Sequence, residues 1–227
     1  MIIGRTLLLS YIDEPNESKR AIYIDVIDEG AGEFSKDDQI GRDSIDLRIG
    51  RIGYKLKKDC GCINTLAVDL EKCFEDVVLD QNGYKLMPSE TLIVGTVERI
   101  KLVGSLMGQV TGRTRYARLG LSVHCTSTKF QGNSNATIIL QLTNHNKVPL
   151  IIFPYQKLAQ LIVHEVSGYP NEALGGNFDN EKTPLKPKFV EKEFSQYSCD
   201  MMEHIKRVNF PYRPFLSLHY RRQLTAL

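Results

Sequence analysis

The sequence of 227 residues has no tryptophan, no long apolar run and an odd number of cysteines, five. A membrane-spanning helix needs about 20 consecutive apolar residues, so no membrane partner is expected. An odd cysteine count does not favour a disulfide framework. Cys60 and Cys62 lack a second ligand pair at the spacing of a structural zinc site, so no protein metal site is expected. The N-terminal segment lacks the basic residues and cleavage site of a leader peptide, which favours a cytoplasmic protein.

The commonest catalytic and nucleotide-binding motifs are also missing. The sequence contains no G-x-x-x-x-G-K-[ST] phosphate loop, and its five histidines form no H-x-x-x-H pair. A formal net charge of +2 does not indicate a nucleic-acid partner. With 42% hydrophobic and 25% charged residues, the composition is that of an ordinary globular protein.

What the sequence does contain, from residue 21 to residue 166, is a series of short apolar runs with alternating polarity. Gly, Asn and Pro separate the runs, and no long helical period lies between them. This pattern favours an all-β sandwich or barrel. Within residues 21–166, only residues 114–121 have helical character, and Gly120 is expected to end that turn. The predicted strands are 21–28, 43–50, 51–56, 84–102, 105–113, 119–124, 136–144, 148–153 and 159–166.

The composition changes after Val166. Residues 167–190 are polar and rich in Gly, Pro and Asn, which predicts a flexible arm. Apolar residues at helical spacing predict a helix after residue 191, and the last residues mix arginines with aromatics. This mixture can bind nucleic acid or dock on a neighbouring subunit, and we favour docking. The expected organisation is a β-barrel domain (1–166), an arm (167–190) and a helical, basic-aromatic C-terminal extension (191–227).

The most informative segment is GRTRYARLGL, residues 112–121. It resembles the G-R-S-S-x-A-R-L-G-L segment of the dCTP deaminase family, whose members are relatives of the trimeric dUTPases. The resemblance implies a mostly β, distorted jelly-roll barrel of the dUTPase-like type, assembled as a homotrimer that binds dCTP or dUTP. The resemblance is compatible with a Mg²⁺ cofactor that binds to the triphosphate of the nucleotide. Further segments that resemble the family, in the same order, are DSIDLRIG (43–50), LMPSETLIVGTVERIKL (86–102), VHCTS (123–127), KFQGNSNA (129–136), IILQLTN (138–144) and PYQKLAQL (154–161).

Three arginines of the first segment, Arg113, Arg115 and Arg118, are the candidate phosphate ligands. The planar fork of an arginine holds two phosphate oxygens at once, and the Thr114 hydroxyl and nearby backbone amides could complete a small anion site. The resemblance implies that Arg113 and Thr114 contact the phosphates. It also implies that Arg118 supports the site, across a subunit boundary in some arrangements. The alternative is a solvated basic turn.

The pyrimidine is expected against the hairpin from residue 125 to residue 141. The resembling family reads the base largely through backbone groups here, which makes Thr126 and Ser127 the candidate base and sugar contacts. Phe130 offers a surface that could stack on the sugar. The alternative for Phe130 is an ordinary core aromatic.

Both positions at which the family carries a catalytic carboxylate hold an amide in this sequence. Gln141 stands at the glutamate of I-x-L-E, and Gln131 stands at the aspartate of I-D-P-G. A neutral amide cannot take a proton from water, and loss of a general base costs about 10²–10⁴ in rate. Asp43, Asp46 and Glu98 fall in strands that are structural in the family.

We therefore expect a nucleotide-pocket protein whose deaminase activity is weak or absent. Two alternatives stay open. One is an active dCTP deaminase that uses a rearranged catalytic group. The other is a scaffold or interaction protein that does not bind nucleotides.

The arm is expected to contact the nucleotide through Phe178 and Lys182. In the resembling family a C-terminal segment closes over the triphosphate, and Phe178 keeps its aromatic residue. Glu181 stands where the family has glutamine, and an acidic side chain repels phosphate unless Lys182 or Mg²⁺ compensates.

Overall fold

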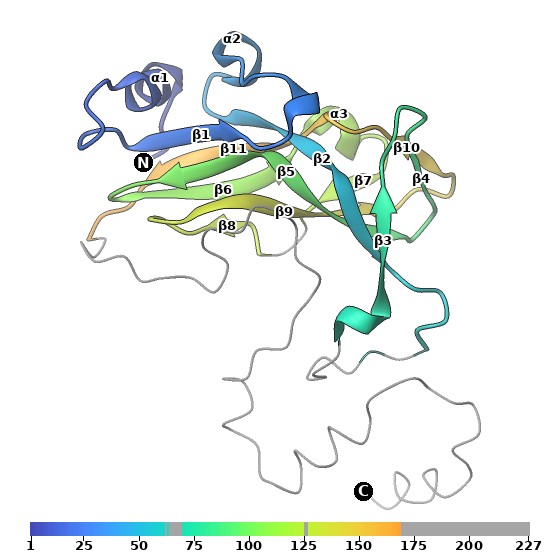
Figure 1. Ribbon diagram of the computed structural model, residues 1–227. Coiled ribbons are helices and arrows are strands. Elements are labelled where there is room, and N and C mark those ends of the chain that lie inside the picture. The colour runs from blue at the N-terminus through green and yellow to red at the C-terminus, as the bar shows by residue number, and fades with distance from the viewer. Residues whose placement is uncertain (62, 64–69, 125–126, 169–227) are drawn as a thin grey trace, which may run out of the picture. The chain divides into compact units, whose positions relative to one another are not determined.

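The computed structural model of the chain (Figure 1) describes residues 1–61, 63, 70–124 and 127–168. It divides the chain into two units, the first of which comprises Met1–Lys55 and Asp76–Pro184. Of the second unit, residues 56–61, 63 and 70–75 are described. The predicted C-terminal helix and the arm residues Phe178 and Lys182 lie outside the described residues. Within the described ranges, no helix is long and apolar enough to cross a membrane.

Antiparallel strands are the main regular elements of the described structure. The strands are β1 (Ile22–Val26), β2 (Ile45–Leu56), β3 (Phe74–Val78), β4 (Tyr84–Leu86), β5 (Thr91–Leu102), β6 (Leu106–Gly112), β7 (Leu121–Val123), β8 (Lys129–Phe130), β9 (Asn135–Asn144), β10 (Leu150–Ile152) and β11 (Lys157–Glu165). One nine-stranded sheet has the order β7-β9-β5-β2-β11-β6-β8, with β1 paired to β5 and β3 paired to β2. A second sheet pairs β10 with β4. The mostly β fold class predicted from the sequence is confirmed.

The large sheet is curled, and irregular pairing between its long strands accounts for the bending. The register shifts between Ile49 and Gly53 of β2, and between Gly95 and Arg99 of β5. Such bulges kink a strand and increase its twist. In β9, Leu140 and Leu142 face the interior while Gln141 between them is exposed. The curled sheet therefore encloses a single hydrophobic core.

The helices are short and lie between or before the strands. They are α1 (Arg5–Asp13), α2 (Lys36–Gln39) and α3 (Thr114–Ala117), with 3₁₀ turns at Glu29–Ala31 and Leu70–Cys73. The turn predicted near residue 114 is α3. Gly120 ends this segment with a φ of 75°, a conformation that glycine adopts without steric cost.

Some boundaries differ from the sequence predictions. The runs 43–50 and 51–56 form one continuous strand, β2, and the run 84–102 is divided into β4 and β5. The division falls at Pro88 and Ser89, where a turn closes with a hydrogen bond from the Glu90 amide to the Met87 carbonyl oxygen (3.1 Å). Helix α1 and strands β3 and β8 were not predicted, because none of them has a long periodic apolar pattern.

A buried ion pair joins β5, β2 and α2. Glu98 of β5 is completely buried, and its Oε1 atom accepts hydrogen bonds from Arg48 Nε (2.7 Å) and Gln39 Nε2 (2.8 Å). Its Oε2 atom accepts the backbone N–H of Arg48 (2.9 Å). The Arg48 guanidinium also donates to the carbonyl oxygens of Ala31 and Gly32. A charge without water is stable in this place only because all of these partners are present.

We predict that Arg48→Ala lowers the free energy of unfolding by about 3–5 kcal/mol, because Glu98 would keep a buried charge without its cation. Chemical denaturation measures this change. The matched control is Arg51→Ala, which breaks the more exposed pair between Arg51 Nε and Asp28 Oδ2 (3.1 Å). The control should cost much less, because solvent screens an exposed pair. Equal losses in the two variants would contradict this account of Glu98.

Candidate functional site

The candidate phosphate segment follows directly on the end of β6. Arg113 occupies the N-cap position of α3 with an extended φ of −82°, and Thr114 opens the helix. Thr114, Arg115 and Arg118 are exposed, so their side chains are free to meet a ligand. The Arg115 guanidinium lies over the Tyr116 ring, 5.8 Å from its centroid. The structure thus presents the three predicted arginines on one short turn.

The backbone amides of this turn are mostly used within it. The amides of Tyr116 and Ala117 donate to the Arg113 carbonyl oxygen (3.0 and 3.2 Å), and the Arg118 amide donates to that of Thr114 (3.1 Å). These three amides are therefore not available to a phosphate. The anion site predicted here therefore draws its donors from the side chains and the remaining amides of the turn.

Arg113 is the most constrained of the three arginines. Its Nη2 atom lies 3.3 Å from Asp46 Oδ2, and its Nη1 donates to the Lys157 carbonyl oxygen (3.3 Å). The Arg113 side chain keeps 28% of its surface exposed. A guanidinium has five N–H donors, so the contacts with Asp46 and Lys157 leave donors free for phosphate oxygens.

Gln141 lies on β9 with its side chain exposed. Its backbone pairs with Ile93 of β5, and its carbonyl oxygen accepts the amide of His124 (3.1 Å). The structure therefore puts the predicted catalytic position beside the segment that enters the candidate base hairpin. His124 was not singled out from the sequence.

The His124 ring contacts the backbone of the candidate base hairpin. Its Nε2 atom lies 2.5 Å from the Ser127 carbonyl oxygen. Because a carbonyl oxygen can only accept, Nε2 is the donor in this contact. Nδ1 is buried and has no hydrogen-bond partner among the residues that the structure describes.

Residues on both sides of positions 125–126 have a left-handed backbone conformation. His124 has a φ of 58° and Ser127 a φ of 53°. Each non-glycine residue in this left-handed region costs about 1–2 kcal/mol, and such strain often occurs where a chain binds a ligand. Ser127 is exposed, as a base or sugar contact must be. Thr126, the other predicted contact, lies outside the described residues.

Phe130 and Gln131 occupy different surroundings. Phe130 lies in the hydrophobic core with 9% of its surface exposed, as the alternative interpretation of an ordinary core aromatic expects. Gln131 is exposed and comes directly after Phe130, which pairs with Gly108 of β6. Since Gln131 is level with Met107, six residues along β6 separate it from Arg113, about 20 Å at 3.3 Å per residue. Within one chain, Gln131 is therefore not close to the phosphate segment.

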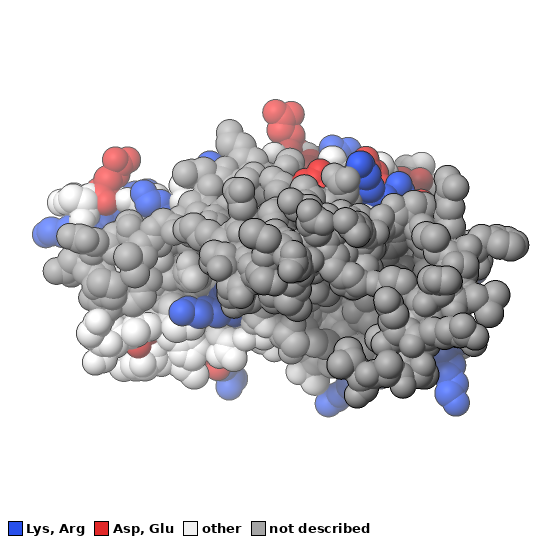
Figure 2. Space-filling model, turned by 90° about the horizontal axis from the view of Figure 1, so that it is seen from below, with Lys and Arg blue, Asp and Glu red and all other residues white. Residues whose placement is uncertain are grey.

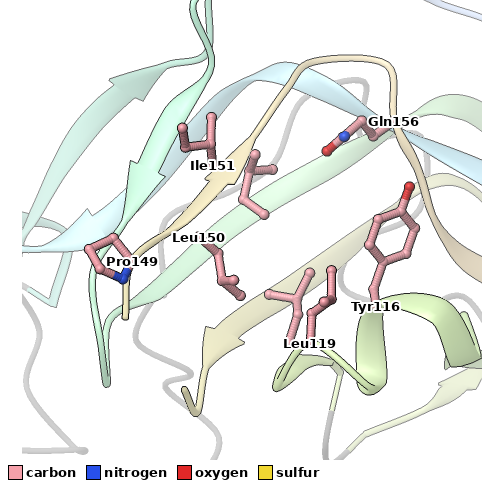
Figure 3. A pocket seen from close by; sticks show the side chains of 8 residues that line it. Tyr116, Leu119, Pro149, Leu150, Ile151 and Gln156 are labelled. Carbon is pink, nitrogen blue, oxygen red and sulfur yellow. The ribbon is translucent and has the colours of Figure 1, made fainter. Parts of the chain in front are cut away.

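An apolar pocket adjoins the phosphate segment, between α3 and β10 (Figure 3). The Tyr116 phenol and the Gln156 amide supply its polar side-chain groups. Several hydrophobic side chains at and near its mouth are exposed, among them Leu119 (53%) and Ile151 (57%). The lining residues are Tyr116, Leu119, Leu121, Pro149, Leu150, Ile151, Ile152 and Gln156.

Charges of both signs occur on the described surface seen in Figure 2, and along its upper edge they lie next to one another. In that view the described side chains form no continuous basic face of the kind that tracks a nucleic-acid backbone. The described residues also contain no group of three or more His, Cys, Asp or Glu side chains that could hold a metal ion.

Sequence reasoning missed the residues that hold Arg113 in place. Asp46 was assigned to a structural strand, and Lys157 contributes through its backbone. The signal in the sequence was an acidic residue between the buried positions Ile45 and Leu47 of a predicted strand. A carboxylate in such a place needs a partner, but its partner was not identifiable from local pattern.

The chain is similar in sequence to proteins of known activity. Residues 18–166 match the family model described as dCTP deaminase-like. The dUMP-forming dCTP deaminase of Dictyoglomus thermophilum is 28% identical over 166 residues, which are 68% of this chain and 85% of that protein. The dUMP-forming enzyme of Halobacterium salinarum is 30% identical over 140 residues, 60% of this chain and 72% of that protein.

Among solved structures, the 2′-deoxycytidine 5′-triphosphate deaminase of Agrobacterium tumefaciens resembles this fold with a TM-score of 0.53. The likeness covers 71% of this chain and 48% of the other chain, so this chain spans about half the length of that structure. At 15% sequence identity the likeness concerns the fold alone. It agrees with the fold that the sequence motifs predicted.

Proposed function

This chain belongs to the dCTP deaminase-like family, and we propose that it binds a deoxypyrimidine nucleoside triphosphate, dCTP or dUTP, with weak or absent deaminase activity. The observation that carries the proposal is Gln141, an exposed amide on β9 beside His124. The sequence resemblance assigns this position to the general base. We infer the nucleotide class, dCTP or dUTP, from the activities of the relatives named above.

The chemistry of deamination explains why an amide matters at this position. Water attacks C4 of cytosine, ammonia leaves, and a carbonyl remains at C4. A base must take a proton from the water, and protons must reach the ring and the departing amine. Gln141 keeps the approximate shape and hydrogen-bonding reach of a glutamate, but it is neutral at every physiological pH and cannot take that proton.

Recognition of the triphosphate does not depend on that base. Arg113 has free N–H donors, and Thr114, Arg115 and Arg118 are exposed on the same turn. We propose that a Mg²⁺ ion enters with the triphosphate, bound by phosphate oxygens. The cytoplasmic location remains a prediction, as do the arm contacts of Phe178 and Lys182.

We predict that dCTP or dUTP with Mg²⁺ raises the melting temperature of the full chain, whereas dCTP releases little or no ammonia.

Gln141→Glu should increase ammonia release by about 10²–10⁴, because it restores a group that can take a proton. Gln81→Glu, the same change at an exposed glutamine in the turn between β3 and β4, is the control and should not increase it. Robust ammonia release by the unmodified protein would contradict the proposal. If neither nucleotide raises the melting temperature, the scaffold alternative is favoured.

One observation favours the alternative of an active deaminase with a rearranged catalytic group. His124 Nδ1 has no hydrogen-bond partner among the described residues, and the His124 backbone amide donates to the carbonyl oxygen of Gln141. Imidazole takes protons near neutral pH. If the ring turns toward bound base, Nδ1 could serve in place of the missing carboxylate.

For this alternative we predict that His124→Gln lowers the rate of ammonia release by at least about 10². The glutamine amide can still donate to the Ser127 carbonyl oxygen, but it has no basic lone pair. His145→Gln is the control, since His145 is an exposed histidine bonded to the Ser122 hydroxyl. An equal rate in His124→Gln and the unmodified protein would exclude His124 as the base.

We propose that the chain assembles as a homotrimer with sites shared between neighbouring copies. Gln131 lies far from Arg113 along β6, so a site that uses both needs two chains. Exposed apolar side chains beside the phosphate segment offer a surface for association. They are Leu119, Val148, Ile151 and Phe153.

The trimer predicts a mass in light scattering of three times the 25.7 kDa of one chain. Ile151→Glu should shift this mass toward that of a single chain, because a buried unpaired carboxylate opposes association. Ile27→Glu, a change at another exposed isoleucine (39%, against 57% for Ile151), is the control. A monomeric unmodified protein would refute the assembly.

A further inference from the structure

We infer that Asp46 is a positioning residue for phosphate recognition: it holds the Arg113 guanidinium in the orientation that meets the triphosphate. The inference rests on the proposed nucleotide binding and adds a residue that acts through another. Asp46 lies on β2 with 8% of its surface exposed, and its Oδ2 atom is 3.3 Å from Arg113 Nη2. The acidic side chain thus lies behind the guanidinium, in a largely buried place.

Asp46 is itself held by amides from two separate elements. Its Oδ1 atom accepts a hydrogen bond from Gln160 Nε2 (2.8 Å), on the neighbouring strand β11. Its carbonyl oxygen accepts one from Gln39 Nε2 (3.0 Å), on α2. The same Gln39 amide donates to the buried Glu98. The carboxylate of Asp46 is therefore fixed in position before any ligand arrives.

The contacts of Arg113 fix the plane of its guanidinium. Nη2 is paired with Asp46, and Nη1 donates to the Lys157 carbonyl oxygen. Lys157 is in turn anchored, since its Nζ atom lies 2.6 Å from Asp38 Oδ1. A long flexible side chain normally loses rotational freedom when it binds a phosphate, and an arginine that is already oriented loses less.

Two effects of Asp46 oppose each other. Its negative charge repels a triphosphate and partly neutralises Arg113, which weakens binding. Its contact orients Arg113, which strengthens binding. Because the carboxylate is largely buried and is satisfied by Gln160 and Arg113, we assign it the second role. Removal of the Asp46 charge would therefore strengthen triphosphate binding if repulsion dominates, and weaken it if the orientation of Arg113 dominates.

The test is titration of the full chain, with Mg²⁺, against dCTP and against deoxycytidine, which has no phosphate. Asp46→Asn should weaken dCTP binding about tenfold and leave the affinity for deoxycytidine within about twofold, because only phosphate recognition depends on Arg113. Gln160→Met changes no charge but removes the clamp on Asp46, and it should weaken dCTP binding about threefold. Asp28→Asn is the matched control, since Asp28 pairs with Arg51 and does not touch Arg113.

The outcomes separate the inference from the function on which it rests. Unchanged or tighter dCTP binding in folded Asp46→Asn overturns the positioning role, while binding by the unmodified chain upholds the proposed function. If Asp46→Asn does not fold, unchanged dCTP binding in Gln160→Met overturns the inference instead. An equal loss of dCTP and deoxycytidine binding shows general damage to the pocket and also overturns it. If the unmodified chain binds neither dCTP nor dUTP, both proposals fall.

Discussion

The charge of Glu98 in the interior of the sheet is the constraint on which the described site depends. A carboxylate without water must be surrounded by donors, and Arg48 and Gln39 provide them from β2 and α2. The same Gln39 amide reaches the backbone of Asp46, which pairs with Arg113. One electrostatic requirement in the core thereby fixes β5, β2 and α2, and Asp46 of β2 in turn contacts the candidate phosphate ligand Arg113.

Phosphate recognition and deamination require different chemical groups. Phosphate recognition needs oriented cations, which the β6–α3 junction supplies through Arg113 and its exposed neighbours. Deamination needs a group that changes its protonation state, and β9 presents the neutral Gln141. An amide in place of a carboxylate removes the second property without altering the first. This difference is the physical basis of our proposal that the molecule binds a nucleotide but deaminates it weakly or not at all.

Much of the fold was predictable because it follows from local pattern. Alternation of buried and exposed residues located β9, and glycine at a positive φ located the end of α3. Motif order then indicated the family. The pairing of Asp46 with Arg113 and the strained backbone of His124 were not predictable, because they depend on contacts between residues far apart in sequence. The core position of Phe130 was one of two interpretations, and sequence alone did not distinguish between them.

The ion pair between Glu98 and Arg48 also limits the routes by which this sequence can diverge. Replacement of either residue alone leaves a buried polar group without its partner, whereas simultaneous replacement of both by apolar residues removes the problem. The two positions are therefore coupled in evolution, and single-step paths between ionic and apolar forms pass through an unstable ancestor. Sequences descended from this one should retain both residues or lose both together.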